Sequence, residues 1–362
     1  MEYSYITTLF IYTVVFSLSV FFAYLNGVTN KNFWALLAII LPATLAGGRG
    51  ALIGQDFENY LNIANNLSTC GFQLPWEEGW PPLEYGFNLL LWCFAHLFSN
   101  KAIVFSCVYG VLLSLAYFGC LNLDAVYRRQ CLSDAHKIRT QAWIGYCVFL
   151  FACFIPTFNL LRQGLSIACI LYCIPFLLNR NYSKALLVFL LALSFHTSAV
   201  FVLPWILFLG SRDTEKIRTI AAIVFYGLLL VSFPFFANLF GYANYLDSDV
   251  NVGGVNGSIL LLPLVAFSFW LPRNPFFLWI LKGGILALYM WGISFFISYG
   301  YVSRLYYFME IFVITFAIVS RYQQDVNRRS LMLLWVLFFV LGYRYVYVFL
   351  HSGQQLYFEW IK

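Results

Sequence analysis

Three arginines stand at the ends of apolar runs in a chain of which only 10% of the residues are charged. They are Arg49 in GGRGALIGQDFENY, Arg162 in FNLLRQG and Arg304 in SRLYYF. Guanidinium groups hold phosphate through paired, charge-assisted hydrogen bonds. Together the three arginines predict a binding site for a lipid-anchored phosphate or pyrophosphate.

Arg162 lies in a break between two apolar runs, flanked by Asn159 and Gln163. We expect these two neighbours to bind substrate, and the N-terminus of the following helix to add its dipole to the site. The alternative for Arg162 is a snorkelling side chain at a helix end. For Arg304 the alternative is neutralisation by Glu310, which lies six residues deeper in the same run.

Asp56, Glu84 and His196 are the candidates for taking a proton from a hydroxyl group. Asp56 precedes FENYLNIANNL, which predicts a helix, so Asp56 is either its N-cap or a substrate contact beside Tyr60, four residues later. Glu84 precedes a short apolar helix and has the same two interpretations. His196 lies between two short apolar runs and is either the base or a structural residue.

The surroundings of these residues are those of a membrane protein. The chain has 362 residues, of which 62% are hydrophobic, and its charged share is well below the quarter or so typical of soluble domains. Apolar runs of roughly 20 residues recur along the whole chain, each long enough to cross a bilayer as a helix. The first run, residues 5–25, lacks a basic leader and a cleavage site, so it predicts a retained span. We therefore predict an all-α integral membrane protein, with residues 1–362 forming a single polytopic domain.

Polar breaks between the apolar runs predict about ten to twelve transmembrane helices. The predicted spans are 5–25, 33–47, 102–122, 141–158, 163–178, 184–195, 197–209, 217–240, 259–271, 275–299, 304–320 and 331–350. The two spans that flank His196 can also form one bent helix. The segment 85–98 is apolar but short, and we interpret it as a re-entrant or surface helix.

Basic residues in short loops mark the cytoplasmic side of a membrane protein. With these spans, most of the Lys and Arg fall on one face. They are Lys31, Arg128, Arg129, Lys137, Arg139, Arg180, Lys184, Arg212, Lys216, Arg218, Arg273, Arg321, Arg328 and Arg329. A long loop at residues 48–84 falls on the opposite, extracytoplasmic face together with the three arginines named first. Arginine is costly near the membrane on that side, which favours a functional role for it.

The sequence gives little support to metal or nucleotide chemistry. The nine cysteines contain no CxxC pair and no Cys/His cluster with metal-ligand spacing. Asp247 and Asp249 form a single DxD in a turn-rich loop, which is a weak signal. No phosphate-cradling glycine loop precedes a Lys-Ser/Thr pair. We predict no metal, no cofactor and no nucleic-acid partner.

Five short motifs follow one another along the chain. They are R-x4-GQD-x3-Y at 49–60, LEYGFNLL at 83–90, FNLLRQGLSIA at 158–168, FHTSAVFVLP at 195–204 and SRLYYF at 303–308. Their order and spacing resemble the EpsG-type branch of the Wzy polysaccharide polymerases, from about residue 45 to 310. The resemblance implies a multi-pass protein of the bacterial inner membrane whose active site faces the periplasm.

The resemblance also implies a reaction. A chain held on undecaprenyl pyrophosphate is transferred to a hydroxyl group of the next lipid-linked oligosaccharide repeat, which builds O-antigen or exopolysaccharide. The expected partners are this lipid-linked oligosaccharide, the lipid bilayer, a chain-length regulator and a flippase. The arginines would stabilise the departing pyrophosphate, and one of the three base candidates would accept the hydroxyl proton.

Two other functions remain as alternatives. A ligase that moves the finished chain to a lipid acceptor would use the same arginine-plus-base chemistry. A flippase or transporter of the lipid-linked unit would place charged residues through the bilayer midplane. Only Lys282 and Glu310 are expected at that depth, and the remaining polar residues gather at the extracytoplasmic face. This distribution favours an enzyme over a transporter.

Overall fold

The computed structural model describes residues 5–49, 57–69, 84–132, 139–158, 160–203, 215–239, 299–322 and 328–351. In these residues it has eleven α-helices and no strand, which confirms the all-α prediction. The α-helices are α1 (Tyr5–Thr29), α2 (Asn32–Gly47), α3 (Phe57–Thr69), α4 (Tyr85–Leu97), α5 (Lys101–Cys131), α6 (Ala142–Val148), α7 (Leu161–Leu178), α8 (Tyr182–Phe195), α10 (Glu215–Leu239), α14 (Tyr299–Tyr322) and α15 (Arg328–His351).

Three of the described helices are long and apolar enough to cross a membrane by length and composition: Ile6–Thr29, Lys101–Cys131 and Leu161–Leu178. Most of the other predicted spans in the described residues also coincide with apolar helices. The predicted spans 259–271 and 275–299 lie outside the described residues, apart from the last residue of the second, so the total of ten to twelve spans stays a prediction.

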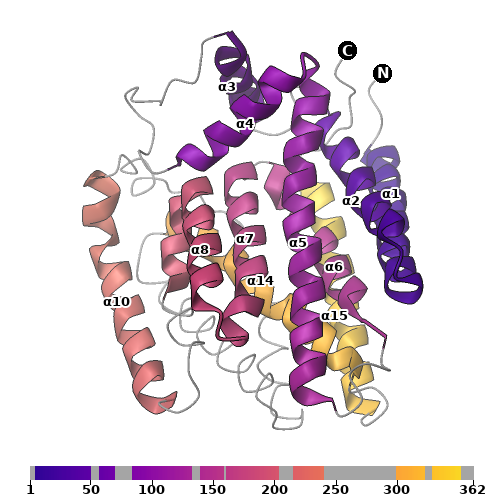
Figure 1. Cartoon of the computed structure of the whole chain (residues 1–362), viewed down its shortest axis with the longest axis vertical. Coiled ribbons are helices and arrows are strands. Elements are labelled where there is room, and N and C mark those ends of the chain that lie inside the picture. The colour runs from indigo at the N-terminus through magenta and orange to yellow at the C-terminus, as the bar shows by residue number, and fades with distance from the viewer. Residues whose placement is uncertain are drawn as a thin grey trace.

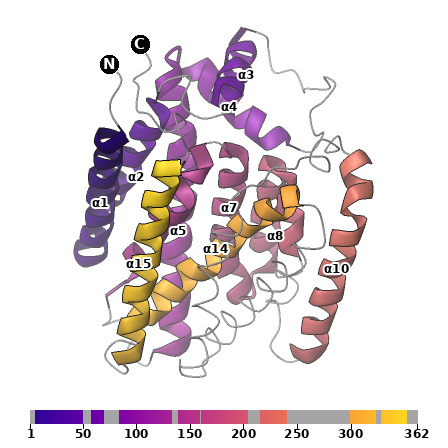
Figure 2. The same cartoon turned by 180° about the vertical axis from the view of Figure 1, so that it is seen from behind.

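The helices form a bundle in which α3 and α4 lie at one end (Figure 1). Helix α4 lies across this end rather than along the bundle, as expected for the short apolar segment 85–98. The first residue of α1 and the last residue of α15 lie at the same end (Figures 1 and 2). Figure 2 shows α14 running diagonally across the bundle toward α15. We call the end that carries α3 and α4 the α3–α4 end.

The outward faces of the peripheral helices are apolar. On α1, Ile6 and Phe10 are 80% and 67% exposed, whereas Tyr12 and Phe16 are fully buried against the bundle. On α15, Phe339 is 78% exposed. Large exposed apolar surface is unfavourable in water and normal against lipid chains. The exposed faces therefore fit a membrane environment.

A break in helix geometry separates α6 from α7. Helix α6 continues as a π-helix, η1 (Phe149–Phe154), and then as a single 3-10 turn, η2 (Pro156–Phe158). The turn packs tightly on the next helix, because a Cβ atom at Gly164 would lie 2.5 Å from Cγ2 of Thr157. This close contact sets the position of the first turn of α7, where Arg162 lies.

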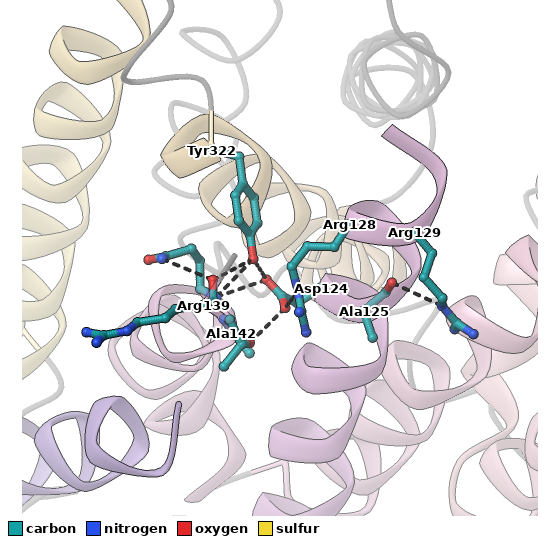
Figure 3. A network of polar contacts seen from close by, with 9 residues as sticks. Asp124, Ala125, Arg128, Arg129, Arg139, Ala142 and Tyr322 are labelled. Carbon is teal, nitrogen blue, oxygen red and sulfur yellow. Dashed lines mark hydrogen bonds and ion pairs between the residues drawn. The ribbon is translucent and has the colours of Figure 1, made fainter. Parts of the chain in front are cut away.

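At the end of the bundle opposite α3 and α4, a buried carboxylate joins three helices (Figure 3). Asp124 of α5 accepts hydrogen bonds from Arg128 Nε at 2.8 Å and from Thr140 Oγ1 at 2.7 Å. It also accepts from the backbone N–H of Gln141 at 3.0 Å and from the Tyr322 hydroxyl at 2.5 Å. Arg128, Arg129 and Arg139, three of the basic residues predicted to face the cytoplasm, lie in or beside this network, and the orientation in the membrane stays a prediction.

The first testable prediction concerns this network. Asp124→Ala would remove the carboxylate that accepts from one cation and several other donors, so the free energy of unfolding should fall by about 3 to 5 kcal/mol. Denaturant unfolding of the purified protein in detergent micelles, followed by circular dichroism, measures the change. Arg129→Ala is the control, because within the described residues this exposed side chain bonds only Ala125 O of its own helix and should change stability by about 0.5 kcal/mol or less. Equal stability of Asp124→Ala and wild type would contradict the structural role.

Candidate functional site

A buried carboxylate organises the polar residues at the α3–α4 end. Glu84, directly before α4, is 2% exposed. Its Oε2 accepts a hydrogen bond from Nη1 of Arg162 at 2.5 Å. Its Oε1 accepts from the backbone N–H and the hydroxyl of Thr197, at 3.2 and 3.3 Å. Glu84 therefore ties together the start of α4, the first turn of α7 and the junction between α8 and the 3-10 helix η3 (Thr197–Val202). We call Glu84, Arg162, His196, Thr197 and Ser198 the Glu84 cluster.

The approach of α4 to α8 depends on a glycine. A Cβ atom at Gly86 would lie 2.2 Å from Oγ of Ser194, far inside contact distance. A residue with a side chain at this position would force the two helices apart. Since Glu84 lies only two residues before Gly86, the missing side chain allows the carboxylate to reach Thr197.

Hydrogen bonds define the protonation of His196, which is 6% exposed. Its Nδ1 accepts the backbone N–H of Ser198 at 3.1 Å and lies 2.7 Å from the Ser198 hydroxyl. An Nδ1 atom that accepts a backbone N–H carries no proton, so neutral His196 carries its proton on Nε2. The carboxylate Oε1 of Glu84 is 3.8 Å from Nδ1, beyond hydrogen-bond distance. In this tautomer Nε2 carries the N–H donor of the ring, and the catalytic role of His196 stays a prediction.

Arg162 is the member of the ion pair that reaches beyond the protein interior. Its side chain is 22% exposed, against 1% for the side chain of Glu84. The neighbouring Gln163 is buried, at 1% exposure. Asn159, on the other side of Arg162, lies outside the described residues. A buried carboxylate thus holds a partly exposed guanidinium at the start of a helix.

Arg49 is fully buried at the end of α2. Its Nη2 donates to the Tyr109 hydroxyl at 2.8 Å and to the Phe158 carbonyl at 2.7 Å. Its guanidinium carbon lies 4.2 Å from the ring centre of Phe57 and 4.4 Å from that of Phe158. These are cation–π contacts on two sides. Arg49 therefore links the start of α3 to the turn before α7.

This position gives Arg49 a specific relation to the other predicted site residues. Phe57 directly follows Asp56, and Phe158 directly precedes Asn159. Asp56 and Asn159 themselves lie outside the described residues. The Nε and Nη1 atoms of Arg49 have no hydrogen-bond partner in the described part of the chain. The direct contact with pyrophosphate stays a prediction, and the N–H groups of these two nitrogens are the candidate donors to an anion.

Of the remaining predicted site residues, Tyr60 has a described side chain and Arg304 does not. Tyr60 is 3% exposed, and its ring centre lies 5.4 Å from that of Phe87 on α4. Arg304 belongs to the first turns of α14, and its side chain is outside the described residues. Helix α3 begins at Phe57, as the pattern after Asp56 predicts. Within the described residues, no group of three or more His, Cys, Asp or Glu could hold a metal ion.

A second ion pair, which the sequence did not predict, lies deeper in the bundle. Glu310 of α14 is fully buried, and its Oε1 lies 2.5 Å from Nη1 of Arg344 on α15. The signal for this pair was available, because both residues interrupt apolar runs. The sequence instead suggests Arg304 as the partner of Glu310, because Arg304 is closer along the chain. The predicted midplane residue Lys282 lies outside the described residues.

The comparison with known families identifies the family of the chain. The model of the EpsG family matches residues 32–362 of the chain. The chain belongs to the EpsG family. No curated protein and no solved structure matches the chain. Membership confirms the resemblance seen in the motifs and indicates a membrane protein with a polysaccharide polymerase-type role.

The second prediction tests how the EpsG-family site is assembled. Gly86→Ala should push α4 away from α8, displace Glu84 and reduce polysaccharide formation by roughly a hundredfold, since displacements of about 1 Å have effects of this size. The double variant Gly86→Ala/Ser194→Gly removes the clashing hydroxyl and should recover most of the loss. The amount of polysaccharide in cells complemented with each variant, at matched protein levels, measures this. Wild-type output from Gly86→Ala alone would show that the α4–α8 contact does not position the site.

Proposed function

We propose that this EpsG-family protein joins lipid-linked oligosaccharide repeats into a polysaccharide at the extracytoplasmic face of the bacterial inner membrane. The observation that carries the proposal is the buried Glu84 carboxylate that holds a partly exposed Arg162 at the first turn of α7. A guanidinium fixed in this way is ready to bind an anionic group without reorganising. The undecaprenyl pyrophosphate of the donor supplies that group.

The proposed reaction is a glycosyl transfer. A hydroxyl oxygen of the acceptor repeat attacks the anomeric carbon of the donor sugar, and the bond from this carbon to the pyrophosphate oxygen breaks. The hydroxyl proton moves to a base, and the bonding electrons leave with the pyrophosphate. Arg162 stabilises the negative charge that develops on the leaving group.

The contacts of the Glu84 cluster support different proposed roles for the three base candidates. Glu84 already accepts bonds from Arg162 and Thr197, so its carboxylate is stabilised as an anion and acts as a holder. His196 accepts the N–H of Ser198 at Nδ1 and can donate through Nε2. Asp56, directly before α3, is the carboxylate that we propose as the base.

The deeper ion pair bears on the transporter alternative. A transporter needs charged residues along a path through the bilayer midplane. Glu310 is fully buried, and its carboxylate is paired with Arg344. A paired charge of this kind links α14 to α15, and the pair itself carries no net charge. The enzyme interpretation is therefore the better supported of the two.

The third prediction tests Arg162. Arg162→Ala should reduce chain extension by a hundredfold or more, because one fixed donor to developing charge contributes on the order of 10²–10³ in rate. Arg162→Lys should recover little of this, because an ammonium group cannot make the paired contact of a guanidinium. The assay uses purified protein with isolated undecaprenyl-pyrophosphate-linked repeats, and gel separation of the products by length.

Arg129→Ala, which changes an exposed arginine at the other end of the bundle, is the control and should retain full activity. Full activity of Arg162→Ala would rule out the proposed anion contact. Full activity of Arg162→Lys would show that Arg162 acts only as a point charge and makes no paired contact.

The fourth prediction separates a donor from a base at His196. His196→Asn keeps an acceptor for the N–H of Ser198, so the turn should stay intact and turnover should fall by about tenfold or less. Loss of a general base would instead reduce turnover by about 10² to 10⁴. Turnover of the same purified system measures the difference, with Asp56→Asn as the variant that we expect to show the larger loss. An inactive His196→Asn beside an active Asp56→Asn would reverse the assignment.

A further inference from the structure

One face of α3 is formed by uncharged amides. Residues Asn59, Asn62, Asn65 and Asn66 are all exposed, and at 100° per residue they fall within about a third of the helix circumference. We call these four residues the asparagine face. Glu58 is the one charged residue among the exposed positions of this helix, and no Lys or Arg occurs in α3.

The four amides have no role within the described structure. None of these side chains makes a hydrogen bond or another polar contact there. Asparagine is also a poor residue for a helix, because its side chain competes with the backbone for hydrogen bonds. An ordinary exposed helix face carries Lys, Glu, Gln or Arg, which favour the helix. The asparagine face therefore lowers helix stability without a compensating contact among the described residues.

Contacts on the opposite side of α3 hold the asparagine face in place. The ring centres of Phe57 and Phe105 are 4.8 Å apart, and Tyr60 packs on Phe87 of α4. At the C-terminal end of the helix, Lys101 Nζ donates to the carbonyl of Ala64 at 3.3 Å. The amides thus project from a helix fixed against α4 and α5, at the end of the bundle that carries the Glu84 cluster.

We propose that the asparagine face binds the saccharide part of the substrate, so this inference rests on the proposed function. Each amide offers both hydrogen-bond donors and an acceptor, which matches the hydroxyl groups of a sugar. A surface that binds anionic lipid headgroups would instead carry Lys and Arg, and both are absent from this helix. A protein partner would favour aromatic and apolar side chains at the centre of the contact.

The dimensions fit a chain rather than a single sugar. The asparagine face extends for about 10 Å along the helix, from the rise of 1.5 Å per residue. Several weak contacts of this kind hold a chain near the site and still let it slide as each repeat is added. The asparagine face would therefore act as a positioning surface for the glycan, while the Glu84 cluster acts on the pyrophosphate end.

Binding of free glycan tests this proposal separately from catalysis. The probe is lipid-free polysaccharide prepared from the cells that carry this gene, titrated into the full-length protein in detergent micelles. The triple variant Asn59→Ala/Asn62→Ala/Asn66→Ala should bind at least about tenfold more weakly, because three pairs of amide hydrogen bonds are lost. Since Ala favours the helix, the variant should unfold no more easily than wild type. Asn32→Ala, at an exposed asparagine in the first turn of α2, is the control and should bind normally.

A second readout is the length of the polymer in cells. The triple variant should shift the polysaccharide to shorter chains while the first joining of two repeats continues. Wild-type affinity and wild-type chain length in the triple variant would overturn the proposal. If the triple variant does not fold, each single Ala variant should weaken binding by about threefold, and normal binding by all of them would overturn it equally. If the purified protein binds glycan but deletion of its gene leaves the polymer unchanged, the proposed function is refuted, whereas glycan binding by the asparagine face is not.

Discussion

The burial of the Glu84 carboxylate is the constraint on which the α3–α4 end depends. A buried carboxylate is costly unless opposite charge and hydrogen-bond donors surround it. Arg162 supplies the charge and Thr197 supplies two donors. Each comes from a different part of the chain, so satisfying one side chain brings α4, α7 and the start of η3 together. The same pairing fixes the one arginine in this cluster that remains partly exposed.

The same principle recurs at other levels of the bundle. Asp124 joins α5, the start of α6 and the end of α14 (Figure 3), and Glu310 joins α14 to α15. Lipid chains are as apolar as leucine, so the hydrophobic effect does little to choose between helix neighbours in a membrane. Buried polar groups make that choice, since each has few possible partners. In this chain the carboxylates specify which helices meet.

Small residues set how closely the helices approach. A Cβ atom at Gly47 would lie 2.2 Å from the backbone nitrogen of Ser106, and one at Gly145 would lie 2.6 Å from Cδ1 of Ile318. Close approach through small residues is the common means of packing in membranes. At Gly86 it also brings the carboxylate of Glu84 within reach of its donors. The packing of the bundle and the geometry of the proposed site therefore depend on the same contacts.

The sequence alone determined the helical membrane fold, the helix after Asp56 and the family, because hydropathy, helix signals and short motifs are local properties. It also identified Glu84, Arg162 and His196 as site residues, with Glu84 and His196 among the candidate bases. It did not predict that Glu84 pairs with Arg162, 78 residues away, or bonds Thr197, 113 residues away. Nor did it predict that Arg49 is buried between aromatic rings or that Nδ1 of His196 is an acceptor. Only the tertiary structure decides these features, because the partner of a buried polar group depends on which distant segments pack together.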